Sequence, residues 1–200
     1  MAWANLDDSA ALAEEYLKAV VGGIIRTHGD DLELLAEQEV AEAKTQNPGD
    51  KILQQPGLMQ ALEAVVECRP WVHISYEEAL QLLQQAEMSE PNRFAKPAPK
   101  WGDDLSPEHE RFICFAAGDG SGAGRPVIVR DYPCECKSFY MRKNDDGRTV
   151  AAMDVLFPRL AEVVGGGQRE ERLDLLQEVC PAHPYDFVPT QLVILSALKC

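Results

Sequence analysis

The sequence predicts an α+β fold in which an antiparallel β-sheet is flanked by helices. The first observation is helical periodicity in the N-terminal part, where Leu12, Tyr16 and Val20 recur at every fourth position. The second is a series of short apolar segments between residues 126 and 164, joined by tight turns, which is typical of strands that pair antiparallel. A length of 200 residues suits one domain of this kind.

The N-terminal region, residues 1–87, is predicted to be mainly helical. Asp8 or Ser9 would cap the first helix, and Gly29 would end it. Ser75 would cap a later helix, because Glu78 stands where a capping box needs a carboxylate. After the first helix, the expected elements are helices over residues 31–44 and 58–66, a turn at 47–49, a strand over 71–74 and a helix over 76–86.

The sheet is expected in the second half of the chain. Its strands would cover residues 126–131, 138–142, 149–156 and 161–164, with a hairpin turn at 144–147. Three glycines at 165–167 are expected to break the last strand, and a strong helix over 168–179 would follow. The predicted organisation is a helical region at 1–87, a linker at 88–100, the sheet core at 101–179 and a tail at 180–200.

Charge and composition exclude several classes of function. Lys and Arg number 19 against 33 Asp and Glu, which gives a net charge of −14 and excludes binding of nucleic acid through general electrostatics. No apolar stretch is long enough for a bilayer, and the first residues lack the pattern of a secretory signal. We therefore expect a cytoplasmic location with no membrane partner. The cysteines are scattered and expected to be free thiols; Cys134 and Cys136 with Cys180 and His183 could bind zinc, but the first two are closer than usual for such a site.

A group of polar residues on or beside the expected strands is the best candidate for chemistry. Glu162 stands among apolar neighbours, where a carboxylate needs a lysine, an arginine or a magnesium ion shared with phosphates. The glycines at 165–167 would let a ligand approach the backbone, and the expected helix after them would favour an anion. A structural network of ion pairs explains the same residues and stays open as an alternative. The group comprises Lys137, Tyr140, Arg142, Asp154, Glu162, Gln168 and Arg169.

The same region resembles the class II aminoacyl-tRNA synthetases. The matching runs are DYP at 131–133, KSFYMR at 137–142 and NDDGRTVAAMDVL at 144–156. The run EVVGGGQREERLD at 162–174 narrows the resemblance to asparaginyl-tRNA synthetases of the bacterial or organellar type. Shorter matches are ANLDD at 4–8, WGDDL at 101–105 and EHER at 108–111, whereas residues 30–70 look like an insertion.

This resemblance implies a set of ligands and residue roles. The family forms an aminoacyl-adenylate from asparagine and ATP with magnesium, and then transfers the amino acid to tRNA. Lys137, Tyr140 and Arg169 would bind the amino acid, since the planar donors of an arginine can engage a carboxamide oxygen. ATP would be bound by Asp154, Glu162, Gly165 and Gly166, with Glu162 holding the magnesium ion. No catalytic residue in the strict sense is implied, because the reaction needs mainly positioning and charge stabilisation.

The departures from the family pattern suggest a truncated catalytic domain. The motif that carries the α-phosphate-binding arginine, the second ATP-binding arginine and the dimerisation motif are missing from the sequence. We therefore expect an asparagine–tRNA ligase fragment with little activity alone, and exposed sheet edges and apolar surface. The alternative is a non-catalytic synthetase-like protein that binds an amino acid or a partner chain. A chloroplast or mitochondrial location is the alternative to the cytoplasm.

Overall fold

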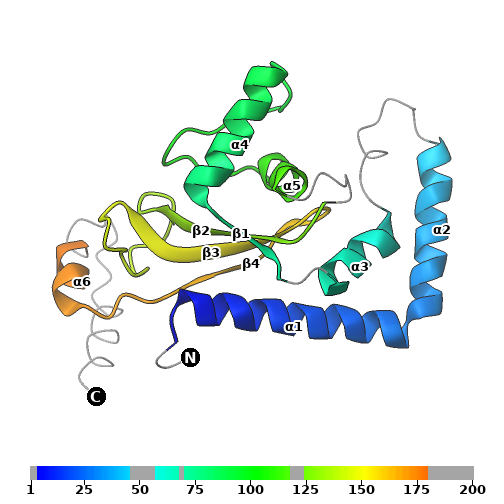
Figure 1. Ribbon diagram of the computed structural model, residues 1–200, viewed down its shortest axis with the longest axis horizontal. Helices are drawn as coiled ribbons and strands as arrows, with labels where there is room; N and C mark the ends of the chain where they lie inside the picture. Colours follow the sequence, from blue (N-terminus) through cyan, green and yellow to red (C-terminus); the bar gives the residue numbers. More distant parts are fainter. Residues whose placement is uncertain (1–3, 46–56, 68–69, 118–123, 180–200) are drawn as a thin grey trace.

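The fold is built around a sheet with the strand order β1-β2-β3-β4. The computed structural model describes residues 4–45, 57–67, 70–117 and 124–179 (Figure 1). The strands are β1 Val72–Ser75, β2 Val127–Pro133, β3 Thr149–Phe157 and β4 Ala161–Gly167. The antiparallel sheet that the sequence predicts is confirmed for β2, β3 and β4.

The first strand departs from the purely antiparallel arrangement. β1 pairs with β2 in parallel, so the sheet is mixed. The cause is the connection between them, which contains α4 (Tyr76–Ser89) and α5 (Pro107–Ala116). A crossover of this length returns the chain to the same end of the sheet, where a short hairpin would reverse its direction. Segment 88–100, which has linker composition, lies in this crossover after most of α4, and its Phe94 is buried.

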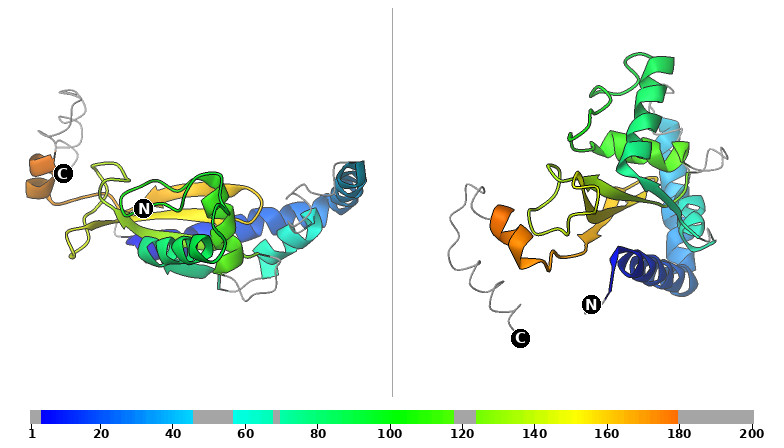
Figure 2. Two further views of the ribbon diagram at one scale, coloured as in Figure 1. Left: turned by 90° about the horizontal axis from the view of Figure 1, so that it is seen from above. Right: turned by 60° about the vertical axis from the view of Figure 1, so that its left-hand side comes forward.

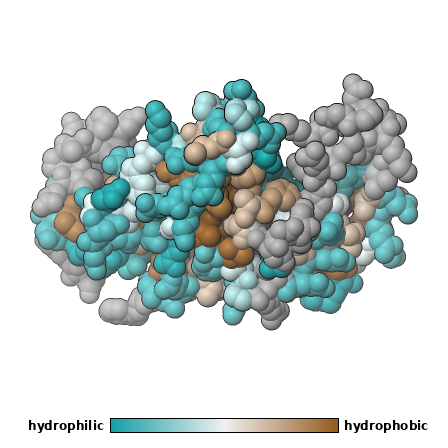
Figure 3. Space-filling model, turned by 45° about the horizontal axis from the view of Figure 1, so that its top comes forward, coloured by the Kyte–Doolittle hydropathy of each residue, from teal (hydrophilic) through white to brown (hydrophobic). Residues whose placement is uncertain are grey.

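Helices cover both faces of the sheet. α4 and α5 pack on one face, and α1 (Leu6–Thr27) packs against β3 and β4 on the other (Figures 1 and 2). All nine residues of β3 are buried, as expected for a strand enclosed on both sides. Viewed from the α4 and α5 side, apolar atoms gather near the middle of the molecule (Figure 3). One apolar core lies on each face of the sheet, and the central strands β2 and β3 contribute side chains to both.

The first helix, α1, begins about one turn earlier than expected. Asn5, and not Asp8 or Ser9, caps α1: its side chain accepts the N–H of Asp8, and the Asp8 carboxylate accepts the N–H of Asn5. α1 then runs without interruption to Thr27, and α2 (Gly29–Thr45) follows almost directly. α3 (Leu58–Glu67) confirms the expected third helix and packs on α1 and α2, whereas the turn expected at 47–49 lies outside the described residues.

The capping box before α4 is confirmed. The Ser75 hydroxyl accepts the N–H of Glu78, and the Glu78 carboxylate accepts the N–H of Ser75 at 2.7 Å. These hydrogen bonds satisfy two donors at the helix start and lower the pKa of Glu78. The boundary between β1 and α4 was therefore predictable from local chemistry.

Three expectations about residues 138–172 are wrong. Residues 138–142 form turns and isolated bridges in place of a strand, because the chain reverses after β2. The glycines at 165–167 continue β4 and pair regularly with residues 152–154. Residues 168–172 are extended, held by hydrogen bonds to residues 140–143, so that α6 comprises only Leu173–Val179.

The outer face of α1 carries exposed apolar side chains, although the sequence suggests that the apolar stripes of this region serve packing. Leu12, Tyr16, Val20 and Ile24 are 50%, 64%, 39% and 43% exposed and follow one another at every fourth position. Four residues make just over one helical turn, so these side chains form one stripe. β1 and β4 are the edges of the sheet. None of the described helices is long and apolar enough to cross a membrane.

Leu156→Ala should destabilise the chain by about 2–5 kcal/mol, because it removes a fully buried side chain between β3 and the α4–α5 face. Leu160→Ala is the matched control, since Leu160 is 68% exposed in the turn after the same strand. Its effect should stay within about 0.5 kcal/mol. Urea unfolding followed by circular dichroism measures both values, and equal effects would contradict the described core.

Candidate functional site

An ion pair between Lys137 and Asp154 forms the centre of the candidate site. Asp154 lies in the middle of β3 and is only 4% exposed. The Lys137 ammonium group donates to both Asp154 carboxylate oxygens, at 2.8 and 2.6 Å. It also lies 4.0 Å from the centre of the Tyr132 ring, which is a cation–π contact. The turns that replace the expected strand at 138–142 thus bring Lys137 over β2 and β3.

Glu162 lies beside this ion pair, across Gly165. Gly165 pairs with Asp154 in the sheet. A Cβ added to Gly165 would lie 2.6 Å from the Glu162 Oε1 and 3.4 Å from the Asp154 Oδ1, so both carboxylates face the same spot. Glycine leaves this space open because it has no side chain. The structure therefore brings Lys137, Asp154, Glu162 and Gly165 together, as the sequence predicts.

The electrostatics of the group favour a cation. Burial raises the pKa of Glu162, and the negative charge of Asp154 raises it further, whereas Lys137 acts in the opposite direction. The carboxylates of Asp154 and Glu162 lie near one ammonium group, and Lys137 donates both of its short hydrogen bonds to Asp154. Glu162 thus remains available for a divalent cation or a further basic group.

Arg169 and Tyr140 form a second group on the same face. Gly165 and Gly167 pair with Asp154 and Ala152, and every second residue of a strand faces the same side, which places Arg169 on the side of Asp154. Its guanidinium lies 3.9 Å from the centre of the Tyr140 ring. A hydrogen bond with Ser138 lowers the pKa of Tyr140, and Arg169 adds to this effect. Arg169 is therefore oriented by an aromatic ring, with its side chain exposed.

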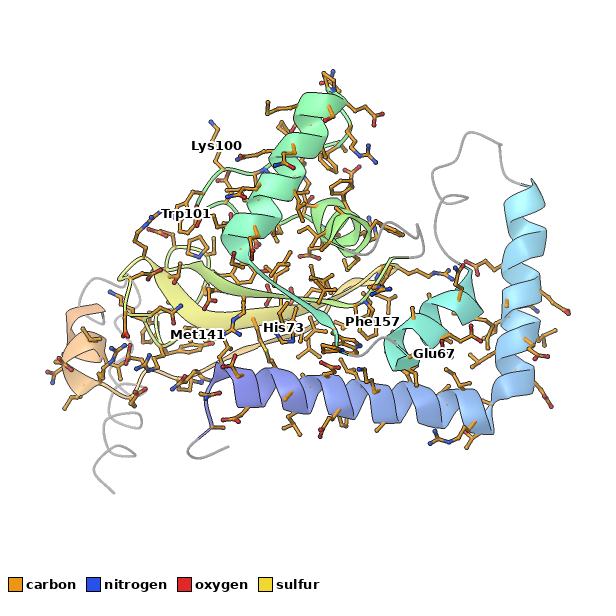
Figure 4. The ribbon with its side chains drawn as sticks, viewed as in Figure 1. Glu67, His73, Lys100, Trp101, Met141 and Phe157 are labelled. Carbon is orange, nitrogen blue, oxygen red and sulfur yellow. The ribbon has the colours of Figure 1, made fainter. Side chains whose placement is uncertain are left out.

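The separation between the two groups suits a small ligand. The four residue-to-residue steps from Gly165 to Arg169 extend over about 13 Å at the rise of a β-strand. Tyr140 is linked to this segment through its carbonyl, which accepts the N–H of Glu170 at 2.9 Å. Met141 forms a bridge with Arg169, and Figure 4 shows Met141 at the end of the sheet nearest to α6. The two groups therefore belong to one continuous surface of the sheet.

The expected anion site at a helix N-terminus is not present at the glycines. Gly165 and Gly166 lie inside β4, and α6 begins only at Leu173. A Cβ at Gly166 would meet only the Met153 methyl, at 3.6 Å, whereas one at Gly167 would lie 2.7 Å from the Ala151 carbonyl and the Met141 sulfur. Gly167 thus allows close packing and Gly165 leaves open space over Asp154, and none of the glycines begins a helix.

Glu170 and Arg172 are structural residues that the sequence did not reveal. Glu170 is 6% exposed; its carboxylate accepts the Arg172 Nε at 2.8 Å and the Lys143 N–H at 2.9 Å. Arg172 also donates to the Lys143 carbonyl. Arg142, another candidate, pairs with Glu171 at 3.1 Å and so takes no part in the ion pair at Asp154. In the run REER at 169–172, only the fold distinguishes the buried Glu170 from the exposed Glu171.

A cavity of about 330 Å³ lies away from these two groups, beside Trp101. Figure 4 shows Trp101 next to α4. Its walls contain carboxylates that already accept hydrogen bonds, such as Asp146 from the Thr149 N–H and Asp131 from Asn144. The Arg148 guanidinium covers the Trp101 ring at 4.7 Å. The lining residues are Ser75, Glu77, Trp101, Asp131, Asn144, Asp146, Arg148 and Thr149.

No group of three or more His, Cys, Asp or Glu side chains among the described residues could hold a metal ion. Cys180 and His183 of the zinc alternative lie outside the described residues. A magnesium ion at Glu162 would therefore need other ligands from a polyphosphate or from water, which is the usual case for magnesium.

The comparison with protein families identifies the chain. The model of the tRNA synthetases class II (D, K and N) matches residues 1–189. The chain belongs to this family. Its sequence is 41% identical to the chloroplastic/mitochondrial asparagine–tRNA ligase of Arabidopsis thaliana, and 43% identical to the asparagine–tRNA ligase of Xanthomonas euvesicatoria. The matches cover 88% of this chain but only 27% and 32% of those two relatives.

Solved structures of class II synthetases confirm the fold. The asparaginyl-tRNA synthetase of Pyrococcus horikoshii complexed with asparaginyl-adenylate matches 98% of this chain with a TM-score of 0.71 and 26% identity. The match covers 37% of that chain. The aspartyl-tRNA synthetase of Entamoeba histolytica gives a TM-score of 0.66 at 17% identity, and so shows the shared fold alone. The α+β class II synthetase-like fold that the sequence predicts is thus confirmed.

Asp154→Asn should lower the pKa of Glu162. The change removes a negative charge beside the Glu162 carboxyl and frees Lys137 to turn toward it, and both effects favour the ionised form. Titration of the Glu162 carboxyl carbon by ¹³C NMR measures the shift. Asp145→Asn, in the exposed hairpin turn, is the matched control and should leave that pKa unchanged. A rise in the Asp154→Asn variant would contradict the described geometry.

Glu170→Gln should remove an acid-sensitive part of the stability. Burial opposes ionisation, but the Arg172 hydrogen bonds and the Lys143 N–H outweigh it and lower the pKa of Glu170 from 4.5 to about 2. A depressed pKa contributes stability above the unfolded value, which is lost as the pH falls from 4.5 toward 2. The variant should therefore lose about 2 kcal/mol at neutral pH and show a flatter acid dependence in urea unfolding. The matched control is Glu171→Gln, since that side chain is 53% exposed and should contribute little.

Proposed function

We propose that this chain carries part of the adenylate-forming site of an asparagine–tRNA ligase. The reaction would join asparagine and ATP to asparaginyl-adenylate, and the asparaginyl group would then pass to tRNA. The observation that carries the proposal is the shared face of β3 and β4, where the Lys137–Asp154–Glu162 group and Arg169 lie at the positions that resemble the family motifs. The chain spans about a third or less of the length of the two relatives that it matches. We therefore propose that the chain alone has little ligase activity.

The amino-acid end of the site would be formed by Arg169, Tyr140 and Lys137. Arg169 presents planar donors that can engage the carboxamide oxygen of asparagine. Tyr140 holds the guanidinium through its ring, so fewer side-chain conformations are lost on binding. Lys137 would attract the substrate carboxylate, since an ammonium donates three hydrogen bonds and Asp154 takes two of them.

The nucleotide end of the site would be formed by Asp154, Glu162, Gly165 and Gly166. Glu162 has a carboxylate without a recorded ion pair among the described residues, which fits a magnesium ion shared with ATP phosphates. Such an ion neutralises charge that develops on the phosphate oxygens. Gly165 and Gly166 leave the backbone accessible, and Asp154 keeps Lys137 in place beside Glu162.

Location and assembly are further parts of this proposal. The two relatives named above come from a bacterium and from plant chloroplasts or mitochondria. We propose the cytoplasm for this chain, with the organelles as the alternative. Resemblance to the family also implies a homodimer and tRNA as a partner.

A non-catalytic protein that binds an amino acid or a partner chain is the second candidate. The exposed stripe on α1 favours it, because exposed apolar side chains in a row are more typical of interaction surfaces than of free surface. The two candidates differ in nucleotide binding. Three calorimetric titrations separate the two candidates: asparagine alone, ATP with magnesium, and all of these ligands together. An adenylate-forming site should bind both asparagine and ATP. The second candidate should bind asparagine alone, or neither ligand.

Arg169→Lys should weaken asparagine binding about 10- to 100-fold in this titration, because the planar pair of donors is lost while the charge remains. The matched control is Arg142→Lys, since Arg142 pairs with Glu171 at 3.1 Å. It should bind asparagine as the unmodified chain does. Equal losses in the two variants would remove the support for Arg169 as a substrate-binding residue.

A further inference from the structure

Glu110 is a buried acidic residue of α5 that faces β4. Glu110 is 8% exposed, and α5 packs against β3 and β4. Its Oε2 accepts the backbone N–H of Glu162 at 3.0 Å. This hydrogen bond joins residues that are 52 positions apart in the sequence. The helix is thus tied to the strand at the residue that points toward Asp154.

The hydrogen bond lies at an irregularity of the sheet. Val155 pairs with Val164 and Leu156 pairs with Glu162, so Val163 has no partner on β3. A bulge of this kind changes the direction of the side chains beside it. β4 is also an edge strand, and an N–H that points away from β3 has no neighbouring strand to accept it. The Glu110 carboxylate supplies the acceptor that the sheet does not.

The burial of a carboxylate at this place requires a reason. Within the described part of the chain, Glu110 makes no recorded ion pair with a lysine or an arginine, and burying an unpaired charge is unfavourable. Glu108, two residues earlier, accepts the N–H of Ala95 at 2.8 Å but is only half-buried. A helix residue at position 110 that served packing alone would be apolar, as is Ile113 on the next turn. An apolar side chain at this position could not accept the N–H of Glu162, whereas the Glu110 carboxylate does.

We propose that Glu110 is a positioning residue for Glu162. Its hydrogen bond holds the bulge of β4, so that the Glu162 carboxyl lies back over Gly165 toward Asp154 and Lys137. Glu110 does not touch a substrate itself; it acts through the backbone of Glu162. The functional meaning of this position rests on the proposed function, whereas the hydrogen bond and its effect on the bulge do not.

The test compares Glu110→Ala, Glu110→Gln and the matched control Glu108→Ala in the full chain. Hydrogen exchange of the Glu162 amide by NMR should be about 10- to 100-fold faster in Glu110→Ala, because the N–H loses its acceptor. Glu110→Gln keeps a carbonyl oxygen at the same place and should restore slow exchange to within about threefold, which a general loss of packing would not produce. Glu108→Ala should leave the Glu162 amide unchanged.

A second measurement connects the position of Glu162 with the site. Line broadening of the Glu162 carboxyl carbon by Mn²⁺ with ATP should need at least about tenfold more Mn²⁺ in Glu110→Ala, but not in Glu110→Gln. Unchanged amide exchange in Glu110→Ala, or no rescue by Glu110→Gln, would overturn the inference. An absence of Mn²⁺ binding in the unmodified chain would instead count against the proposed function, and amide exchange would still decide the role of Glu110. If Glu110→Ala does not fold, Glu110→Asp replaces it, because its shorter side chain cannot reach the N–H.

Discussion

The ion pair between Lys137 and Asp154 is the interaction on which the candidate site depends. Asp154 is buried in the central strand, and removing one partner of such a pair typically destabilises a protein by about 3–5 kcal/mol. The need to neutralise Asp154 draws the segment after β2 over the sheet and places Lys137 above Tyr132. Glu162 then lies next to this ion pair, and its own carboxyl group remains available for another partner.

Much of the fold was predictable because its signals are local. Ser75 and Glu78 define the start of α4 through two hydrogen bonds, and the apolar run of β3 predicts a strand enclosed on both faces. The misassigned segments depend on distant contacts. Residues 168–172 have helical composition but are extended, because Glu170 binds Arg172 and the backbone of Lys143, which is distant in the sequence. Periodicity cannot report such a contact.

In the candidate site, too, some residues were recognisable from the sequence and others depend on distant contacts. Lys137, Asp154 and Glu162 were recognisable as a possible group, since acidic and basic residues in neighbouring strands must find partners. Glu110 was not recognisable, because its role arises from one hydrogen bond across the sheet edge to a residue far away in the sequence. The parallel pairing of β1 was missed for a related reason: the strand is short, and only the crossover through α4 and α5 determines its direction.

The two ends of the site differ in how firmly the described residues hold them. The end at Glu162 is supported by the sheet, by the buried Asp154 and by α5, so its carboxyl position is set before any ligand binds. The end at Arg169 lies beyond β4, where a single bridge to Met141, the ring of Tyr140 and the Glu170–Arg172 pair support an exposed side chain. Preorganisation decreases the entropy lost on binding. If the proposed function holds, cation and phosphate binding would therefore depend mainly on charge, and amino-acid binding on ordering of the segment around Arg169. A chain in which the end at Glu162 is held in place, but the segment around Arg169 is not ordered, would bind nucleotide more readily than asparagine.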